Sequence, residues 1–442
     1  MDIQLSEHFD YRKLVRFTWP SVVMMIFTSI YSVVDGIFVS NFVGKTPFAA
    51  INLMMPLLMV LGAVGFMLGT GGSALVAKTL GEGKPVKANH IFSMIIYVLI
   101  AFSATLTVIG LIFLSDIARL LGADEAMLGY CVSYCSVLLP ILPAFVLQNA
   151  FQPFLVAAER PNLGLYITIA TGVGNILLDA LFIIGFGWGL QGAAWATAIA
   201  QAVGGLLPLA YFSLPNKSPL RLCRTRFYVS SLLKAATNGM SEFMSNISMS
   251  VVALVYNFQL MRFAGEDGVA AFGVIQYCNF IFLSVFLGYS IGSSPIVSYN
   301  YGSRNHAELQ NMYRRSMHIV GATGLLIFVL AQLLARPLAT IFVGYDADLL
   351  SLTVHAFRIY QVSFLLAGFN LYASAFFTAL NNGVVSAVIS CTRTLVCETL
   401  AVILLPMVFG LEGIWYAITV AEVLALCLTV YYLQTLRPRY NY

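Results

Sequence analysis

Between Arg160 and Lys217 the sequence contains only one Asp, Glu, Lys, Arg or His side chain, that of Asp179. Such a stretch is long enough to cross a bilayer twice, because one helical crossing needs about 20 residues. Asp35 is isolated in the same way between Arg16 and Lys45. A charged side chain at the centre of a membrane costs on the order of 3 kcal/mol even on lenient insertion scales. The two acids therefore predict a protein that handles ions or protons inside a membrane.

The composition indicates a membrane environment along the whole chain. Apolar residues make up 60% of the 442 residues, charged residues make up 10%, and the mean hydropathy is +0.86. A soluble domain is excluded because it would need about a quarter charged residues. The apolar runs also lack the alternation of barrel strands. We therefore predict an all-α polytopic membrane protein.

Twelve long apolar runs are candidate transmembrane helices. They lie near residues 14–38, 48–77, 91–114, 127–157, 162–186, 191–213, 235–261, 268–298, 316–335, 352–380, 384–408 and 411–435. Several of these runs are longer than one crossing requires, which predicts tilted or kinked helices.

Basic residues predict how the chain is oriented. With the N-terminus in the cytoplasm, seventeen Lys and Arg residues fall in cytoplasmic segments, against Lys45, Arg119, Arg262 and Arg336 on the other side. Cytoplasmic loops of membrane proteins carry this kind of excess. We therefore expect a multi-pass protein of the cell (inner or plasma) membrane with both termini in the cytoplasm. The net charge of +4 then requires no nucleic-acid partner.

The second half of the chain repeats the first at a constant offset, which is half the length of the chain. Gly71-Gly-Ser-Ala-Leu-Val aligns with Gly292-Ser-Ser-Pro-Ile-Val, and Gly189-Leu-Gln-Gly aligns with Gly410-Leu-Glu-Gly. Six crossings per half is an even number, so both halves start on the same side and form a parallel repeat. This predicts two six-helix lobes related by a pseudo-two-fold axis. Their ranges are 1–213 for the N-terminal lobe, 214–234 for a cytoplasmic linker and 235–442 for the C-terminal lobe.

The isolated acids have polar neighbours that suit a cation site. Asn175 lies four residues before Asp179, so both side chains share one face of a helix. With Asp35 and with Thr197 of the next span, they would form an all-oxygen site for Na⁺ or a carboxylate pair that shares a proton. The alternative interpretation is a buried polar network that only holds helices together.

The second half lacks both acids, because Tyr256 and Leu400 stand at the repeat positions of Asp35 and Asp179. It contains other ionisable residues within its spans: Glu242, Glu398, Glu422 and Arg393. Arg393 can pair with one of these acids, so a structural ion pair and a substrate or coupling site both remain open. Flexible Met side chains suit a cavity that accepts several ligand shapes, although Met is more often ordinary packing. The candidates for a substrate cavity are Tyr31, Met54, Met55 and Glu242.

Enzymatic and metal sites are not predicted. The five His and seven Cys residues show no metal-ligand spacing, so no metal cluster and no cofactor is expected beyond the coupling ion, H⁺ or Na⁺. Gly288-Tyr-Ser290-Ile-Gly292 matches the G-x-S-x-G pattern of serine hydrolases, but it lies inside an apolar run instead of a strand-to-helix turn. An intramembrane hydrolase is therefore disfavoured.

The chain resembles the multidrug and toxic compound extrusion (MATE) family. The stretches that carry the resemblance are Ser32-Val-Val-Asp-Gly-Ile-Phe-Val-Ser, Gly292-Ser-Ser-Pro-Ile-Val-Ser-Tyr-Asn-Tyr-Gly and Ala373-Ser-Ala-Phe-Phe-Thr-Ala-Leu-Asn-Asn-Gly. The likeness is to the bacterial and archaeal branch with its coupling acids in the N-terminal lobe. It implies coupling roles for Asp35, Asn175, Asp179 and Thr197, and it places a further site residue at Tyr134.

The resemblance implies a secondary antiporter, not an enzyme. Such a protein exports amphipathic, often cationic organic molecules in exchange for H⁺ or Na⁺ by rocking two lobes around a central cavity. Its partners would be the small organic substrate and membrane lipid, with no nucleic acid, and we expect a monomer. A lipid-linked oligosaccharide flippase of a related superfamily is the nearest alternative. A flippase would need several cationic residues for pyrophosphate, and only Arg358 and Arg393 lie within spans.

Overall fold

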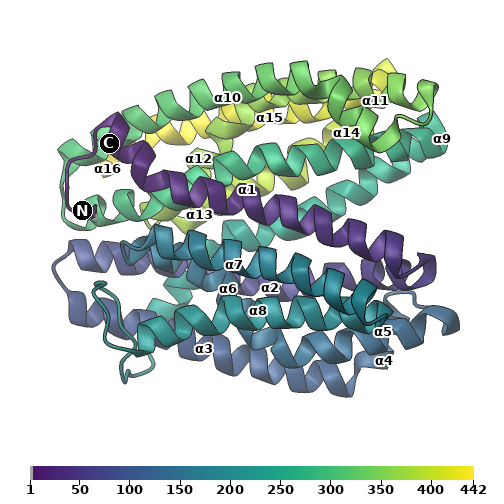
Figure 1. Cartoon of the computed structure of the whole chain (residues 1–442). Helices are drawn as coiled ribbons and strands as arrows, with labels where there is room; N and C mark the ends of the chain where they lie inside the picture. Colours follow the sequence, from purple (N-terminus) through teal and green to yellow (C-terminus); the bar gives the residue numbers. More distant parts are fainter. Residues whose placement is uncertain (1–2) are drawn as a thin grey trace.

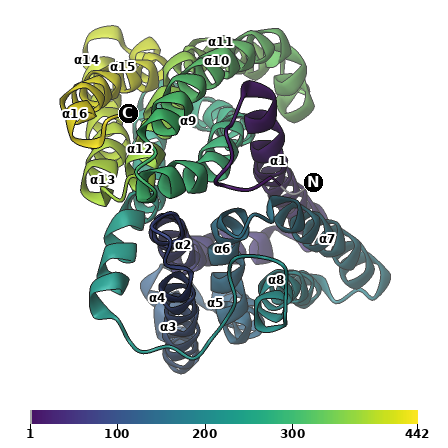
Figure 2. The same cartoon turned by 90° about the vertical axis from the view of Figure 1, so that its left-hand side faces the viewer.

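The computed structural model describes residues 3–442, apart from several side chains between residues 36 and 49. Throughout this range the chain forms helices joined by short loops and one longer connection. The helices form two bundles, one of α2 to α8 and one of α9 to α16, and α1 runs along the boundary between them (Figures 1 and 2). The predicted all-α membrane fold is confirmed.

The first lobe supplies six crossings from segments that are partly broken. Its elements are α1 (Tyr11–Phe42), α2 (Lys45–Gly81), α3 (Pro85–Ile112), α4 (Leu114–Leu120), α5 (Glu125–Leu138), η1 (Leu139–Ile141), α6 (Leu142–Ala157), α7 (Pro161–Asp179), η2 (Ala180–Gly185) and α8 (Gly189–Ser213). The 3₁₀ turn η1 contains Pro140 and joins α5 to α6 within one crossing. Proline has no backbone N–H to donate, which explains the break.

The second lobe follows the same plan. Residues 214–228 connect it to α8 without helix. Its elements are α9 (Val229–Gly302), α10 (His306–Val343), α11 (Ala347–Tyr360), η3 (Gln361–Ser363), α12 (Phe364–Ala379), α13 (Gly383–Cys391), η4 (Thr392–Glu398), α14 (Thr399–Phe409), α15 (Leu411–Thr435) and α16 (Arg437–Tyr440). The 3₁₀ turn η3 interrupts a crossing as η1 does, and η2 and η4 are both π-helical. The breaks therefore recur in both halves.

The long helix α9 contains two crossings. A straight helix of its 74 residues would be about 110 Å long, which is several times the thickness of a bilayer. Gly265 interrupts it with φ 62° and ψ −149°. Both ends of α9 contact the last part of α2, since Gly239 approaches Met67 and Gly302 approaches Lys78. The chain therefore reverses near Gly265, and the eleven apolar helical stretches of the described chain give twelve crossings.

The two lobes are pressed together at the end of the molecule that carries both termini (Figure 1). At Gly239 of α9 an added Cβ atom would overlap the carbonyl oxygen of Met67 in α2. At Gly302 an added Cβ atom would overlap the carbonyl oxygen of Lys78. Only glycine allows two backbones to approach so closely. The lobes therefore meet backbone against backbone at this end.

The segment before α1 fastens the same end of both lobes. The backbone N–H of Leu5 donates a 2.8 Å hydrogen bond to the carboxylate of Glu159, which follows α6 in the first lobe. The backbone N–H of Phe9 donates a 3.0 Å hydrogen bond to the buried carboxylate of Glu308 at the start of α10. His8 Nδ1 lies 2.6 Å from the other carboxylate oxygen of Glu308. We call residues 3–10 the N-terminal strap.

Candidate functional site

Asp35 and Asp179 are brought together from helices far apart in the sequence. Asp35 lies on α1, Asp179 is the last residue of α7, and their carboxyl groups are within hydrogen-bonding reach of each other. Asp179 is completely buried. Among the described residues, no donor reaches either carboxylate oxygen of Asp179 or the Oδ1 atom of Asp35. The site is therefore a pair of carboxyl groups facing each other, with its acceptors unsatisfied.

This arrangement has a direct chemical consequence. Two ionised carboxylates repel each other at close range, and the repulsion is strong in a medium of low dielectric constant. A proton on one carboxyl group removes the repulsion and provides a donor to the other. The pair formed by Asp35 and Asp179 is therefore suited to bind one proton, or a small cation between its oxygens.

Two further helices close the site. Tyr134, in α5, is buried and lies near both acids, and its hydroxyl is within hydrogen-bonding reach of the Thr197 side chain in α8. Asn175 is buried one turn before Asp179 on α7, and its amide nitrogen has no hydrogen-bond partner in the described part of the chain. The structure thus gathers Tyr134 and Thr197 around the two acids and leaves Asn175 with an unused donor on the same helix.

The backbone after Asp179 departs from regular α-helix. The π-helical segment η2 begins at the next residue, Ala180. Aromatic rings pack within and just after this segment. Phe182 stacks on Trp188 with ring centroids 5.0 Å apart and on Phe186 with centroids 6.0 Å apart. The N–H of Trp188 also donates a 2.9 Å hydrogen bond to the carbonyl of Phe182. Single π-helical turns are frequent at functional sites, where they re-aim a side chain.

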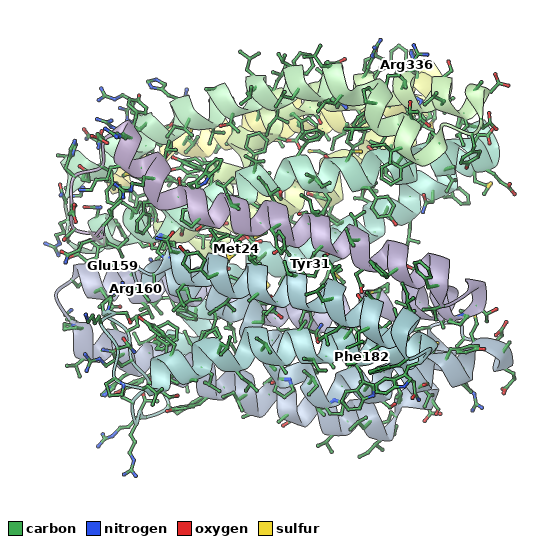
Figure 3. The ribbon with its side chains drawn as sticks, viewed as in Figure 1. Met24, Tyr31, Glu159, Arg160, Phe182 and Arg336 are labelled. Atoms are coloured by element: carbon green, nitrogen blue, oxygen red, sulfur yellow. The ribbon has the colours of Figure 1, made fainter. Side chains whose placement is uncertain are left out.

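The acid pair lies toward the end of the molecule opposite the N-terminal strap. Figure 3 places Glu159 and Arg160 at the strap end, Phe182 toward the other end and Tyr31 between them on α1. Arg160 immediately precedes α7 and Asp179 is its last residue, so the full length of this helix separates the two. The acids therefore lie away from the end where the strap fastens to Glu159 and Glu308.

The four candidates for the substrate cavity occupy different environments. Tyr31 packs between α1 and α7, with its ring against Gly172 and its hydroxyl near enough to Asp35 for an electrostatic interaction. Met54 is fully buried in the core of the first lobe, where it lines a small apolar cavity of about 130 Å³. Met55 is half-buried. Glu242 is partly buried one turn beyond Gly239, next to the backbone contact between α2 and α9 that closes this end of the molecule.

In the second lobe, Arg393 is paired with Glu422. The Nε and Nη2 atoms of Arg393 each lie 2.7 Å from Oε1 of Glu422. Asn370 donates a 2.7 Å hydrogen bond to the other carboxylate oxygen, and Thr429 donates one of 2.8 Å to Asn370. Of the two alternatives left open by the sequence, Glu422 thus has the geometry of a structural ion pair. Glu398 does not share in these hydrogen bonds.

A two-lobed bundle of twelve crossings with a parallel internal repeat is the architecture of a membrane transporter. The MatE family model matches residues 20–181 in the first lobe and 243–403 in the second. The two matches cover most of the chain, so this protein belongs to the MatE family. The resemblance found in the sequence is confirmed.

Curated relatives match over almost their whole length. The multidrug export protein MepA of Staphylococcus haemolyticus (strain JCSC1435) is 24% identical over 436 residues, which cover 97% of this chain and 94% of the relative. MepA of Staphylococcus saprophyticus is 25% identical over 435 residues, covering 96% and 94%. Both are similar to this chain in length and order of segments.

Solved structures of MATE proteins share the fold. One described as a MATE in complex with MaL6 superimposes with a TM-score of 0.92 at 23% identity, covering 97% of this chain and 96% of the other. One described as an outward-facing conformation of a multidrug resistance MATE family transporter superimposes with a TM-score of 0.91 at 24% identity, with the same coverage. At these identities the likeness establishes the fold.

Proposed function

We propose that this protein is a secondary antiporter of the cell membrane that exports amphipathic, often cationic organic molecules in exchange for protons. The observation that carries the proposal is the facing pair of carboxyl groups of Asp35 and Asp179, three of whose oxygens are buried without a donor among the described residues. Family membership and the multidrug export proteins among its relatives support the class of substrate. Tyr134 and Thr197 help to hold the pair, and Asn175 supplies a further polar group.

The orientation follows from the charges. With the strap end in the cytoplasm, the basic segments lie inside, as positive-inside proteins require. The glycine contacts between α2 and α9 then seal the cytoplasmic side, and the acid pair is reached from outside. In our proposal a proton binds to the pair in this state. The lobes rock to open the cytoplasmic side, where the proton is released and a substrate molecule is taken up for export.

The energy available is adequate for multidrug export. A charge that crosses a potential of about 100 mV releases roughly 2.3 kcal/mol. One unit of pH difference adds about 1.4 kcal/mol per proton. Since about 1.4 kcal/mol corresponds to a tenfold gradient, one proton can sustain a ratio of a few hundred. No nucleotide is needed for such transport.

The two alternatives lack support in the geometry. A flippase for pyrophosphate-linked lipids would need free cations in its cavity, whereas Arg393 is engaged by Glu422. A hydrolase would need a base beside its nucleophile, whereas the buried hydroxyl of Ser290 has no hydrogen-bond partner among residues 3–442. Serine is a weak nucleophile unless an adjacent base activates it.

Uptake of ethidium into proteoliposomes tests the proposal. Ethidium carries a permanent charge, so a pH gradient cannot trap it without a carrier. Acid-loaded vesicles in neutral medium should accumulate ethidium when they contain the protein, because protons leave as the dye enters. Vesicles loaded with Na⁺ at equal pH should accumulate none.

The controls are vesicles without protein and vesicles treated with an ionophore that collapses the pH gradient. Accumulation driven by Na⁺ alone would replace the proton by Na⁺ in this proposal. An absence of accumulation under both gradients would contradict the antiport mechanism.

A further inference from the structure

The second lobe contains a buried polar cluster that the proposed mechanism does not use. It consists of Arg393 and Glu398 in η4, Glu422 in α15, Tyr256 in α9 and Tyr360 in α11. Glu422, Tyr256 and Tyr360 are at most 2% exposed, and Glu398 is 7% exposed. The cluster brings two carboxyl groups and one guanidinium group into an apolar lobe.

The charges of this cluster do not balance. Arg393 directs two of its N–H groups to Oε1 of Glu422, and Asn370 occupies the second oxygen of that carboxylate. The positive charge of Arg393 is thus balanced by the negative charge of Glu422. Among the described residues no basic side chain forms a salt bridge with Glu398, although Arg393 is near enough to attract it. Glu398 is therefore a carboxyl group in excess, buried where an uncompensated charge is costly.

A second observation points to a ligand at Glu398. The hydroxyl of Tyr256 is fully buried and has no hydrogen-bond partner of good geometry within residues 3–442, yet it lies beside the Glu398 carboxyl. Buried hydroxyls are almost always hydrogen-bonded, and an exception calls for an explanation. A group that alternates between ionised and protonated forms offers the hydroxyl an acceptor in one form and a donor in the other.

The internal repeat relates this cluster to the acid pair of the first lobe. Tyr256 stands at the repeat position of Asp35. Glu398 ends the π-helical segment η4, and Asp179 immediately precedes the π-helical segment η2. The two segments interrupt corresponding crossings of the two lobes. Each lobe thus places one carboxyl group at a π-helical segment, facing the residue at the Asp35 position.

From this geometry we infer that Glu398 is a second proton-binding site, which loads and releases one proton in each transport cycle. The groups that face it are Tyr256, Tyr360, Arg393 and Glu422. A proton neutralises Glu398 without adding a cation to the cluster. A metal cation bound at Glu398 would instead lie near the guanidinium of Arg393, which would repel it. The site therefore favours H⁺ over Na⁺.

The inference rests on the proposed antiport and adds its stoichiometry. With one proton at the acid pair and one at Glu398, two protons exchange for each molecule of a monovalent substrate. A variant that lacks the carboxyl group of Glu398 should exchange one. Exchange of two protons for one monovalent cation moves net charge across the membrane, whereas exchange of one proton is electroneutral.

The experiment is a null-point measurement with ethidium in proteoliposomes whose membrane potential is clamped at zero. A tenfold concentration ratio and one pH unit carry the same free energy per particle. A tenfold ethidium gradient should therefore be balanced by about half a pH unit in the wild type and by about one pH unit in Glu398→Gln. Glu412→Gln, which alters an exposed carboxylate of α15, should balance where the wild type does.

A wild-type null point at one pH unit would overturn the inference, as would a null point of Glu398→Gln that stays at half a unit. Glu398→Met, which removes the charge without burying an unpaired amide, serves the same comparison if the Gln variant does not fold. Wild-type vesicles that show no response to pH would instead contradict the antiport itself, so the two failures are distinguishable.

Discussion

The carboxyl group of Asp35 on α1 lies within hydrogen-bonding reach of the carboxyl group of Asp179 on α7, although α2 to α6 lie between them in the sequence. Neither helix contains another acid among the described residues, so the pair exists only because the two helices pack together. Their contact links the protonation of one residue to that of the other. The proton binding that we propose for this pair would thereby depend on the position of α1, which runs along the boundary between the lobes (Figure 1).

Replacement of Asp179 should remove coupling and preserve the fold. Asp179→Asn keeps the size of the side chain and removes the group that can share a proton with Asp35. Ethidium uptake by acid-loaded vesicles should fall to the level of vesicles without protein, while expression and elution on size exclusion stay unchanged. Asp116→Asn, at an exposed position of α4, is the matched control and should transport normally. Wild-type uptake by Asp179→Asn would exclude Asp179 from coupling.

Asp35 of the first lobe should matter more for proton coupling than Glu242 of the second lobe. Asp35→Asn should abolish the response of uptake to the pH gradient, because in our proposal the lobes rock only after the acid pair has bound its proton, so a proton at Glu398 alone drives no transport. Glu242→Gln should retain most of this response, since Glu242 lies one turn beyond Gly239 on α9 and neither Asp35 nor Asp179 acts on it electrostatically. Initial rates at several pH gradients measure both variants. The expected order would be refuted by an uncoupled Glu242→Gln beside a coupled Asp35→Asn.

Contact between α2 and α9 should depend on the absence of a side chain at Gly239. Gly239→Ala places a Cβ atom on the carbonyl oxygen of Met67, so the closed end cannot form without displacement of a helix. Transport should fall severely. Gly273→Ala lies on the same helix with nothing near the new atom, and it should be neutral or stabilising by about 0.5–1 kcal/mol. Equal transport by the two variants would disprove the role of this contact.

The ion pair of the second lobe should be sensitive to the loss of one partner. Arg393→Met leaves the buried carboxylate of Glu422 without its cation, and loss of one partner from a buried pair costs about 3–5 kcal/mol. The apparent Tm in detergent should drop clearly. Addition of Glu422→Gln should restore much of it, because the amide can still accept from Asn370. Equal melting temperatures for the single and double variants would show that the charge of Glu422 does not require Arg393.

Loss of the strap contact should loosen the closed end. Glu308→Ala removes the acceptor for the Phe9 N–H and the partner of His8. The population with separated lobes should grow, because the strap would then be hydrogen-bonded to the first lobe, through Leu5 and Glu159, without its bonds to Glu308 in the second. Double electron–electron resonance between labels at Lys87 and Arg304, in a cysteine-free background, measures this separation. An unchanged distance distribution would mean that the contact of the strap with Glu308 does not hold the lobes together.

The sequence alone was sufficient for the membrane fold, since the length of the apolar runs decides it. The isolation of Asp35 and Asp179 in such runs was also enough to mark them as unusual. Their mutual contact was expected from the cost of an unpaired acid, not from any local pattern. The twelve expected runs agree with the crossings, although one helical stretch, α9, contains two of them.

Contacts between distant residues were beyond the reach of local patterns. The pairing of Arg393 with Glu422 rather than Glu398 depends on where α15 packs against η4. The repeat showed that Tyr256 stands at the position of Asp35. From the sequence this indicated only that the second lobe lacks an acid there. The approach of Tyr256 to Glu398, which lies just before the repeat position of Asp179, follows from the path of the π-helical segment.

The glycine contacts between α2 and α9 have a further consequence for how tightly the molecule can hold a gradient. A closure made of side chains can leak when single side chains change rotamer, whereas a closure made of two backbones in contact has no side chain whose rotation would open it. To breach it, an entire helix must be displaced. We therefore expect this end to open by the movement of a whole helix, which limits the leak of protons that are not exchanged for substrate.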